Sequence, residues 1–332
     1  MAEQQFFYGG QAVIEGVMIR GRRCFSLAVR RLNGDVYAIS EPLSQIYTGR
    51  LRRVPLLRGV LVLIETLALG LKALNRSATM AIEDQVGDKE DVPGWLMGVS
   101  LIVAFALGIG LFFIMPLFAT RPLDDAFSSD ILSNIIEGLI RLVVLIAYVG
   151  AIGLLKDIRR IFAYHGAEHM AVHTHEAGLP LEVEYVRRFP TAHPRCGTAF
   201  LLTVMVVAIV VFAFLGRSPL WWLVLSRIVF IPVIAAISYE IIRFSGAHHS
   251  NPLTRLMTYP GLLLQRLTTR VPDDGQIEVA IRAMTTALAA DVETPMVGGG
   301  REAEAGLLAT QEGQKAQGRS QAGQVEGGEV LH

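Results

Sequence analysis

The residues best suited to chemistry lie in a histidine-rich stretch, Tyr164-His-Gly-Ala-Glu-His-Met-Ala-Val-His-Thr-His-Glu176, and in a second short motif, His193-Pro-Arg-Cys-Gly197. On a helix, residues four apart stack on one face, so His165, His169 and His173 share a stripe with Glu168 beside it. Two imidazoles one turn apart can chelate a divalent ion, and a neighbouring carboxylate can polarise a water bound to that ion. The order His-x-x-Glu-His is also that of the inverted zinc-protease motif.

These residue types predict a metal site. Half of the eight histidines of the chain fall within this one stretch, and chance explains such clustering poorly. We expect His165 and His169 to be ligands, with His193 as a third ligand and Cys196 as a candidate fourth. Imidazole and thiolate ligands together favour zinc as the divalent metal. Glu168 is then the candidate general base. The alternative is a surface histidine cluster that holds no metal.

The composition indicates a membrane protein with a soluble portion. Hydrophobic residues make up 52% of the 332 residues, and the mean hydropathy is +0.44, above the balance of a soluble domain. The formal net charge is zero, so no basic field argues for nucleic acid as a partner. Two cysteines are too few for a disulfide framework, which suits a reducing compartment. The first residues lack a basic region followed by an apolar run, so we expect no cleaved signal peptide.

The predicted fold class is mainly α, with about four transmembrane helices, amphipathic interfacial helices and a small β-rich cytoplasmic module. Four stretches are long and apolar enough to span a bilayer core, namely residues 95–119, 131–155, 199–215 and 220–239. Within them, Glu137 and Arg141 lie one helical turn apart and can neutralise each other. Arg227 needs a partner in the membrane, and we expect a structural ion pair there, with a proton or ion pathway as the alternative.

The distribution of arginine and lysine predicts the orientation in the membrane. Arg121 and Arg217 are the only basic residues in the short connections after the first and third stretches. The middle connection holds six, which are Lys156, Arg159, Arg160, Arg187, Arg188 and Arg195. We therefore expect a multi-pass protein of the plasma membrane with both termini and the histidine-rich connection in the cytoplasm. The lipid bilayer and a membrane-bound substrate are the expected partners.

The remaining segments have their own patterns. Residues 1–53 contain short β-prone runs, with a hairpin at Asn33-Gly34. The glycine-rich run from Gly9 to Gly21 is either a loop approaching a ligand, with Glu15 as ligand or base, or a strand whose glycines serve turns and bulges. The predicted segments are a β-rich module (1–53), an interfacial segment (54–93), a first transmembrane pair (94–155), a metal-site segment (156–198), a second transmembrane pair (199–240), amphipathic helices (241–292) and a disordered tail (293–332). The interfacial segment consists of a helix at 55–77 and an acidic linker at 82–92. The metal-site segment contains a helix at 158–172 and a strand at 181–189.

Several unusual motifs occur together in one order. They are Gly9-Gly-Gln-Ala-Val-Ile-Glu-Gly-Val-Met-Ile-Arg-Gly21, Tyr164-His-Gly-Ala-Glu-His169, His193-Pro-Arg-Cys-Gly-Thr198, Ile237-Ser-Tyr-Glu240 and Gln265-Arg-Leu-Thr-Thr-Arg270. In this respect the chain resembles the bacterial YqhQ family, from about residue 7 to residue 288. The resemblance implies a multi-span plasma-membrane protein and a metal-dependent enzyme of undefined substrate. Its implied site matches here at His165, Glu168, His169, His193 and Cys196.

Two functional classes fit these observations. The first is a metal-dependent hydrolase that acts on a membrane-associated substrate at the cytoplasmic interface. The second is a non-catalytic metal-binding scaffold, sensor or transporter. A catalytic site keeps one coordination position open, whereas a structural site is closed by four protein ligands. Cys196 therefore separates the two classes, because a thiolate beside three histidines would close the site.

Overall fold

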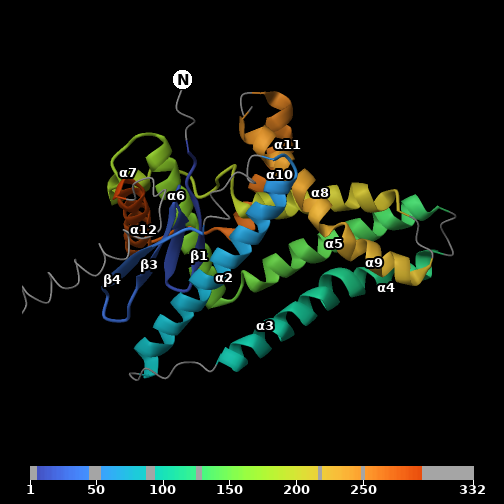
Figure 1. Cartoon of the computed structure of the whole chain (residues 1–332), viewed down its shortest axis with the longest axis horizontal. Helices are drawn as coiled ribbons and strands as arrows, with labels where there is room; N and C mark the ends of the chain where they lie inside the picture. The colour runs from blue at the N-terminus through green and yellow to red at the C-terminus, as the bar shows by residue number, and fades with distance from the viewer. Residues whose placement is uncertain are drawn as a thin grey trace, which may run out of the picture. The chain divides into compact units, whose positions relative to one another are not determined.

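The structure, a computed structural model, describes residues 6–44, 54–86, 94–124, 129–215, 219–247 and 251–293, and these are mainly helical with one small sheet (Figure 1). In chain order they form strands β1 (Gly9–Val13), β2 (Gly16–Arg20), β3 (Cys24–Arg30) and β4 (Val36–Pro42), and helices α2 (Leu57–Val86), α3 (Gly94–Ile109), α4 (Met115–Asp124), α5 (Asp130–Ile152), α6 (Lys156–Glu176), α7 (Val183–Val186), α8 (Gly197–Ala213), α9 (Leu220–Val229), α10 (Ile231–Ala247), α11 (Pro252–Thr268) and α12 (Asp274–Glu293), with a π-helical turn, η2 (Gly110–Ile114), between α3 and α4. The predicted disordered tail after residue 293 lies outside the described residues.

The sheet is a four-stranded antiparallel meander in the order β1-β2-β3-β4. The predicted hairpin at Asn33-Gly34 is confirmed, because it joins β3 to β4 with Arg30 opposite Val36. Gly34 has φ +91, a left-handed conformation that glycine adopts without steric cost. The β-rich segment is therefore real and begins and ends within the predicted limits.

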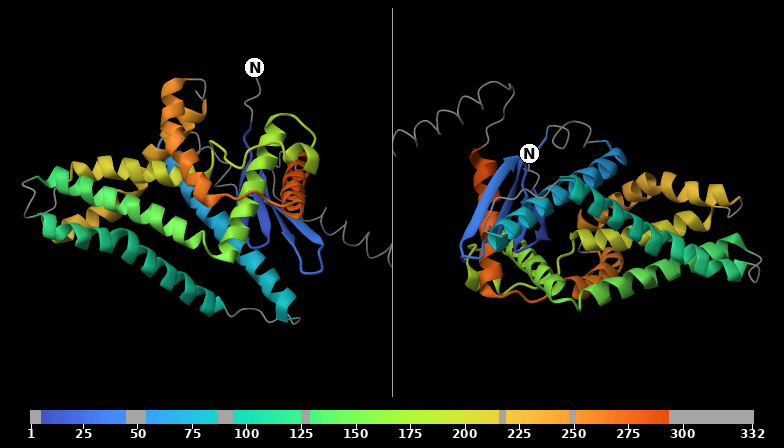
Figure 2. Two further views of the ribbon diagram at one scale, coloured as in Figure 1. Left: turned by 180° about the vertical axis from the view of Figure 1, so that it is seen from behind. Right: turned by 90° about the horizontal axis from the view of Figure 1, so that it is seen from below.

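Both faces of the sheet are buried under helices that come from distant parts of the sequence. On one face, Val17 and Ile19 pack against α6 and α12. On the other face, Met18 packs against α2. Figure 2 shows the sheet between α12 and α2 in its right-hand view. Because alternate side chains point to opposite faces, four of the five residues of β2 are buried. The sheet is thus the middle layer of a three-layer unit.

The prediction of a strand over residues 181–189 is wrong, because the segment contains the helical turn α7. The alternating pattern suggested a strand, but the apolar residues that reach the core are Val183, Val186 and Phe189, each three apart. That spacing places them on one side of a helical turn, where they pack with Met170 of α6 and Ile277 of α12. Packing therefore decided the conformation of this segment.

Helix α2 is longer than predicted and takes up part of the predicted acidic linker. Glu83 and Asp84 lie within it, and both pair with Arg31 of the β3–β4 hairpin. These ion pairs let the helix continue to Val86. The other part of the predicted linker, residues 87–92, lies outside the described residues.

Two charged residues of α2 face the protein. Arg58 pairs with Glu240 of α10, and Glu65 pairs with Arg20 of β2 at 2.9 Å. The exposed side of α2 carries five large apolar residues, Leu57, Ile64, Leu67, Leu71 and Leu74, and toward its C-terminal half also Lys72 and Arg76. A helix that turns Arg58 and Glu65 inward and a row of apolar side chains outward suits contact with lipid.

Two helical segments are long and apolar enough to cross a membrane, residues 98–122 and 130–152. The bent pair α9 and α10 adds a third if it is counted as one span, since a 40° bend separates its halves. Helix α8 is apolar but has only 17 residues. The four predicted spans therefore correspond to four apolar helical segments, of which two or three meet the length required of a span.

A polar cluster lies inside the apolar helices. Glu137 accepts a hydrogen bond from Arg141 at 2.7 Å, as their one-turn spacing predicts. Arg227 of α9 lies 3.3 Å from the same carboxylate and donates to Asn134 at 3.0 Å. The predicted structural ion pair of Arg227 is therefore confirmed. All four side chains are buried, and the two guanidinium groups share the one carboxylate of Glu137 away from water.

Candidate metal centre

Helix α6 carries the histidine stripe. It does not continue from α5, because Leu155 has extended backbone angles and caps a new helix. Tyr164, Ala167 and Ala171 are fully buried on the side of α6 that faces the sheet. The opposite side meets the segment around residues 189–196 and the end of α11. Close approach is possible at Gly166, where a Cβ atom would lie 2.2 Å from the carbonyl oxygen of Arg270.

Three of the four predicted ligands come together. His165, His169 and Cys196 each present one donor atom, and these atoms lie within 4.8 Å of one another. The Nε2 atom of His165 is 3.2 Å from the Sγ atom of Cys196. Cys196 reaches this position as the N-cap of α8, where the Thr198 amide donates to its sulfur at 3.4 Å. The arrangement has the donor types and the size of a site for one transition-metal ion.

Backbone carbonyls fix the orientation of both imidazoles. The Nδ1 atom of His165 lies 2.9 Å from the Thr268 carbonyl oxygen, and the Nδ1 atom of His169 lies 2.6 Å from that of Thr191. A carbonyl oxygen only accepts, so each Nδ1 must carry the proton and each Nε2 atom has its lone pair free. Metal-bound histidines commonly donate their second N–H in this way. Burial also lowers the pKa of His169, which keeps the ring neutral and able to bind.

Glu168 is buried beside this group. Its Oε2 atom lies 3.9 Å from the Nε2 atom of His169, and its Oε1 atom accepts the N–H of Gly10 at 2.9 Å. Burial raises the pKa of Glu168 above its ordinary value, although His165, His193 and the Gly10 amide oppose the shift. A carboxyl group with a raised pKa is suited to general acid–base work.

The contact with Gly10 shows what the glycine-rich motif does: it brings the backbone of β1 to the Glu168 carboxylate. We expect Gly10→Ala to be strongly destabilising, because the added Cβ would lie 2.0 Å from the Met18 carbonyl oxygen, within the β1–β2 ladder. Gly9→Ala is the matched control, since nothing lies within 4 Å of its Cβ. Thermal unfolding of the two variants in detergent tests this. Equal unfolding temperatures would show that β1 does not approach β2 as described.

His193 lies in a second group of donors. It comes together with His173 and Glu176, whose donor atoms also lie within 4.8 Å of one another. The tight turn before α8 causes the separation, because Cys196 donates its N–H to the His193 carbonyl oxygen and the two side chains then diverge. The stripe on α6 therefore serves two groups: His165 and His169 face Cys196, and His173 faces His193.

Charges in the second group are arranged around Glu176. One carboxylate oxygen pairs with Arg195, and the other lies 3.4 Å from the Nε2 atom of His193. Burial alone would raise the pKa of Glu176, but hydrogen bonds from His193 and Arg195 outweigh it and lower the pKa. Burial lowers the pKa values of His173 and His193. At neutral pH the group therefore contains a carboxylate and two neutral imidazoles.

The end of α11 positions both groups, which the sequence did not reveal. Gln265 is fully buried, and its side chain accepts the His193 N–H at 2.7 Å and donates to the His193 carbonyl at 2.8 Å. Thr268 supplies the carbonyl that orients His165, and Thr269 contacts Thr191. The motif Gln265-Arg-Leu-Thr-Thr-Arg270 was the available signal, and its role is to hold the ligands in place.

Glu15 has a structural role in this fold. It lies in the β1–β2 turn with φ 53, and its carboxylate pairs with Arg160 and accepts the Tyr164 hydroxyl at 3.2 Å. It belongs to neither group of metal donors found among the described residues. The turn interpretation of the glycine-rich run therefore explains Glu15, while Gly10 provides the link to the site.

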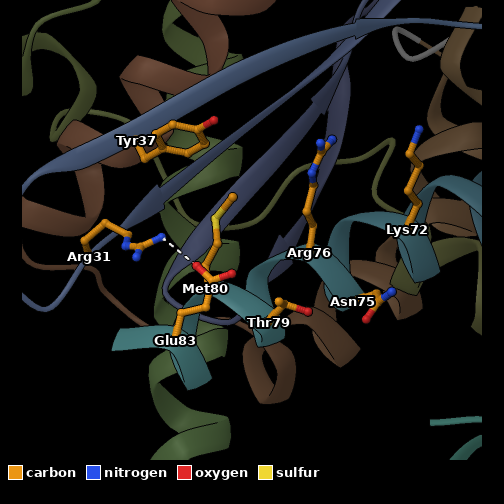
Figure 3. A pocket seen from close by; sticks show the side chains of 8 residues that line it. All are labelled: Arg31, Tyr37, Lys72, Asn75, Arg76, Thr79, Met80 and Glu83. Carbon is orange, nitrogen blue, oxygen red and sulfur yellow. Dashed lines mark ion pairs between the residues drawn. The ribbon is translucent and has the colours of Figure 1, made fainter. Parts of the chain in front are cut away.

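A separate hollow of about 530 Å³ lies on the α2 side of the sheet, away from the histidines (Figure 3). Its lining consists of Arg31, Tyr37, Lys72, Asn75, Arg76, Thr79, Met80 and Glu83. The cations in it are paired, Lys72 with Glu41 and Arg31 with Glu83. It contains no metal donor of either group.

These features define a mainly helical protein with membrane-type helices, a small sheet and two candidate metal-binding groups. The chain belongs to the DUF1385 family, whose model is described as a protein of unknown function and matches residues 54–290. It is also 34% identical over 292 residues to the uncharacterized protein YqhQ of Bacillus subtilis (strain 168), a match that covers 85% of this chain and 92% of that protein. The resemblance seen in the motifs is thereby confirmed. No solved structure matches the chain.

Proposed function

We propose that the protein is a membrane-embedded, metal-dependent hydrolase. In this proposal His165, His169 and Cys196 hold a divalent ion, with zinc favoured by their donor types, and Glu168 is the general base. The observation that carries it is the three-donor group with a buried carboxylate 3.9 Å from one donor. Three protein ligands leave one coordination position for water or substrate, as catalytic zinc sites do. His193 lies with His173 and Glu176 instead, so it does not fill this fourth position, which supports an open site.

The chemistry follows from the roles of these residues. A bound divalent ion supplies a Lewis acid that makes water a nucleophile near neutral pH. Glu168 accepts a proton from the attacking water and returns it to the leaving group. The hydrogen bond from Gly10 keeps one of its oxygens fixed, so the other is aimed toward His169. Partial exposure of His165 leaves this side of the site open to a substrate.

We infer a membrane-associated substrate from the position of the site in the chain. Cys196 caps α8, an apolar helix, so the donors lie at the end of the membrane-type helices. The exposed leucines of α2 support contact with lipid on the same unit. The excess of arginine and lysine in the connection that contains α6 favours a cytoplasmic site at the plasma membrane, with both termini inside.

The test uses the full-length protein in detergent micelles, loaded with Zn²⁺. We expect hydrolysis of at least one of three probes, a chromogenic ester, a phosphodiester or a peptide amide carrying a lipid chain. Glu168→Gln should keep the metal and lose this activity, because a neutral amide cannot act as base. Glu184→Gln, a solvent-exposed carboxylate on nearby α7, is the control and should be as active as the wild type.

Two outcomes would contradict the proposal. Undiminished hydrolysis by Glu168→Gln would remove Glu168 as the base. Stable metal binding with no hydrolysis of any of the three probes would favour the alternative of a metal-binding scaffold, sensor or transporter.

A further inference from the structure

The second group of donors forms a site of its own. We propose that His173, Glu176 and His193 bind a second divalent cation, one helical turn along α6 from the first site. The proposal does not depend on hydrolase activity or on the first site being occupied. It rests on the separation of the donors into two groups, which places a histidine-carboxylate set beside a histidine-cysteine set.

The donors of the second group already converge. Their donor atoms lie within 4.8 Å of one another, and the rings of His173 and His193 have centroids 4.4 Å apart. The Nε2 atom of His193 faces the Oε2 atom of Glu176 at 3.4 Å. A divalent ion bound between them would take the place of the Nε2 proton, which would move to Nδ1 of the same ring, the atom that now accepts the Arg195 N–H at 3.3 Å. Only small side-chain movements are then needed to reach metal–ligand distances of about 2.0–2.2 Å.

Surrounding groups hold the two imidazoles in place. The Nε2 atom of His173 lies 2.9 Å from the Ala192 carbonyl oxygen, so Nε2 carries the proton. The lone pair of Nδ1 is then available to bind a metal ion. The ring of His173 is stacked on Phe189 with 9° between their planes. Gln265 is 0% exposed, and both the oxygen and the nitrogen of its side-chain amide form hydrogen bonds with the backbone of His193. A buried glutamine dedicated to one residue indicates that the position of His193 is fixed before any ligand binds.

Glu176 supplies the negative charge of the group, and Arg195 balances that charge when no metal is bound. Arg195 pairs with one oxygen of Glu176 and is itself held over the ring of Phe7 at 4.1 Å. The other carboxylate oxygen remains available to an ion. Two imidazoles and one carboxylate form a set that binds Zn²⁺, Mn²⁺ or Fe²⁺ and lacks the sulfur of the first site. The two sites therefore differ in ligand chemistry, which makes them separable by spectroscopy.

The test is a titration of the metal-free, full-length protein with Co²⁺. Thiolate ligation gives Co²⁺ an intense charge-transfer absorption in the near ultraviolet, and histidine-carboxylate ligation does not. We expect the wild type to bind two equivalents, of which one develops this absorption. His173→Ala should lose the Co²⁺ equivalent that shows no charge-transfer absorption and keep the equivalent that shows it. Glu176→Gln, a smaller change at a partly exposed residue, should weaken the same equivalent.

Two further variants separate this site from the first. Cys196→Ser should lose the charge-transfer absorption and keep the second equivalent. His175 belongs to neither group of donors, and its ring packs against Tyr8. His175→Ala should therefore bind both equivalents. Saturation of the folded wild type at one equivalent that shows the charge-transfer absorption would overturn the proposal and leave the group as an ion-pair network. So would retention of two equivalents by both His173→Ala and Glu176→Gln. Absence of the charge-transfer absorption from the wild type would instead contradict the first site alone.

Discussion

Replacement of His169 by alanine is expected to lower the affinity of the His165–His169–Cys196 group for Zn²⁺ by more than about 100-fold, because residues that merely orient a ligand already contribute about 10- to 100-fold. His169 belongs to the first group together with His165 and Cys196, and it is only 2% exposed. Its Nδ1 proton is committed to the Thr191 carbonyl, so its Nε2 atom is available to an ion. Competition with a chromogenic chelator measures the change in affinity.

His175→Ala is the matched control for this experiment. It removes an imidazole from the same helix, but its ring packs edge-on against Tyr8 at 5.1 Å and joins neither group of donors. We expect its Zn²⁺ affinity to equal that of the wild type. Equal loss of affinity in both variants would mean that the helix had been disturbed. Equal retention in both would remove His169 from the site.

Replacement of Glu137 by leucine is expected to destabilise the protein by about 3–5 kcal/mol, the cost of breaking a buried ion pair by removing one partner. Glu137 is 2% exposed and is the shared carboxylate of Arg141 and Arg227. Its loss leaves two guanidinium groups within the apolar helices without their anion. Thermal unfolding in detergent, followed by size-exclusion chromatography, measures the effect.

Glu184→Leu is the comparison for this prediction. Glu184 also forms an ion pair with an arginine one turn away, Arg188, but both side chains are largely exposed. An exposed pair contributes little, so the unfolding temperature should change little. A small effect of Glu137→Leu, similar to that of Glu184→Leu, would show that water or lipid headgroups reach the cluster around Arg227.

Local patterns in the sequence identified those features that local physics controls. The apolar stretches that match α3, α5, α8, α9 and α10 are visible from composition alone. The hairpin at Asn33-Gly34 follows from the conformational freedom of glycine. The histidine stripe follows from helix geometry, since His165, His169 and His173 are four residues apart. Each of these depends on neighbours in the chain.

Contacts between distant parts of the chain were not predictable in this way. The burial of both faces of the sheet depends on α6 and α12, which are far away in sequence. Residues 183–189 became a helical turn because Val183, Val186 and Phe189 fit the core with a spacing of three. The pairing of Glu137 with Arg227 also joins residues 90 positions apart, although the need for a partner was visible.

The candidate site was predictable in its residue types but not in its division. The spacing of His193 and Cys196 suggested that both complete one site. The turn between them sends their side chains to different histidines of α6, which no pattern in the sequence indicates. The positioning atoms were also hidden, because Thr268 and Thr191 act through backbone carbonyls that every residue type has. Among the positioning groups, only Gln265 acts through its side chain, so only its role depends on residue type.

The ligand set of the first site is the central claim, and an X-ray absorption spectrum at the zinc K edge tests it most directly. The full-length protein is saturated with Zn²⁺, freed of unbound metal and compared with Cys196→Ser treated in the same way. The structure predicts a sulfur scatterer at about 2.3 Å together with imidazole nitrogens at about 2.0–2.1 Å in the wild type, and loss of the sulfur in the variant. A zinc shell of nitrogen and oxygen alone in the wild type would contradict the assignment of His165, His169 and Cys196.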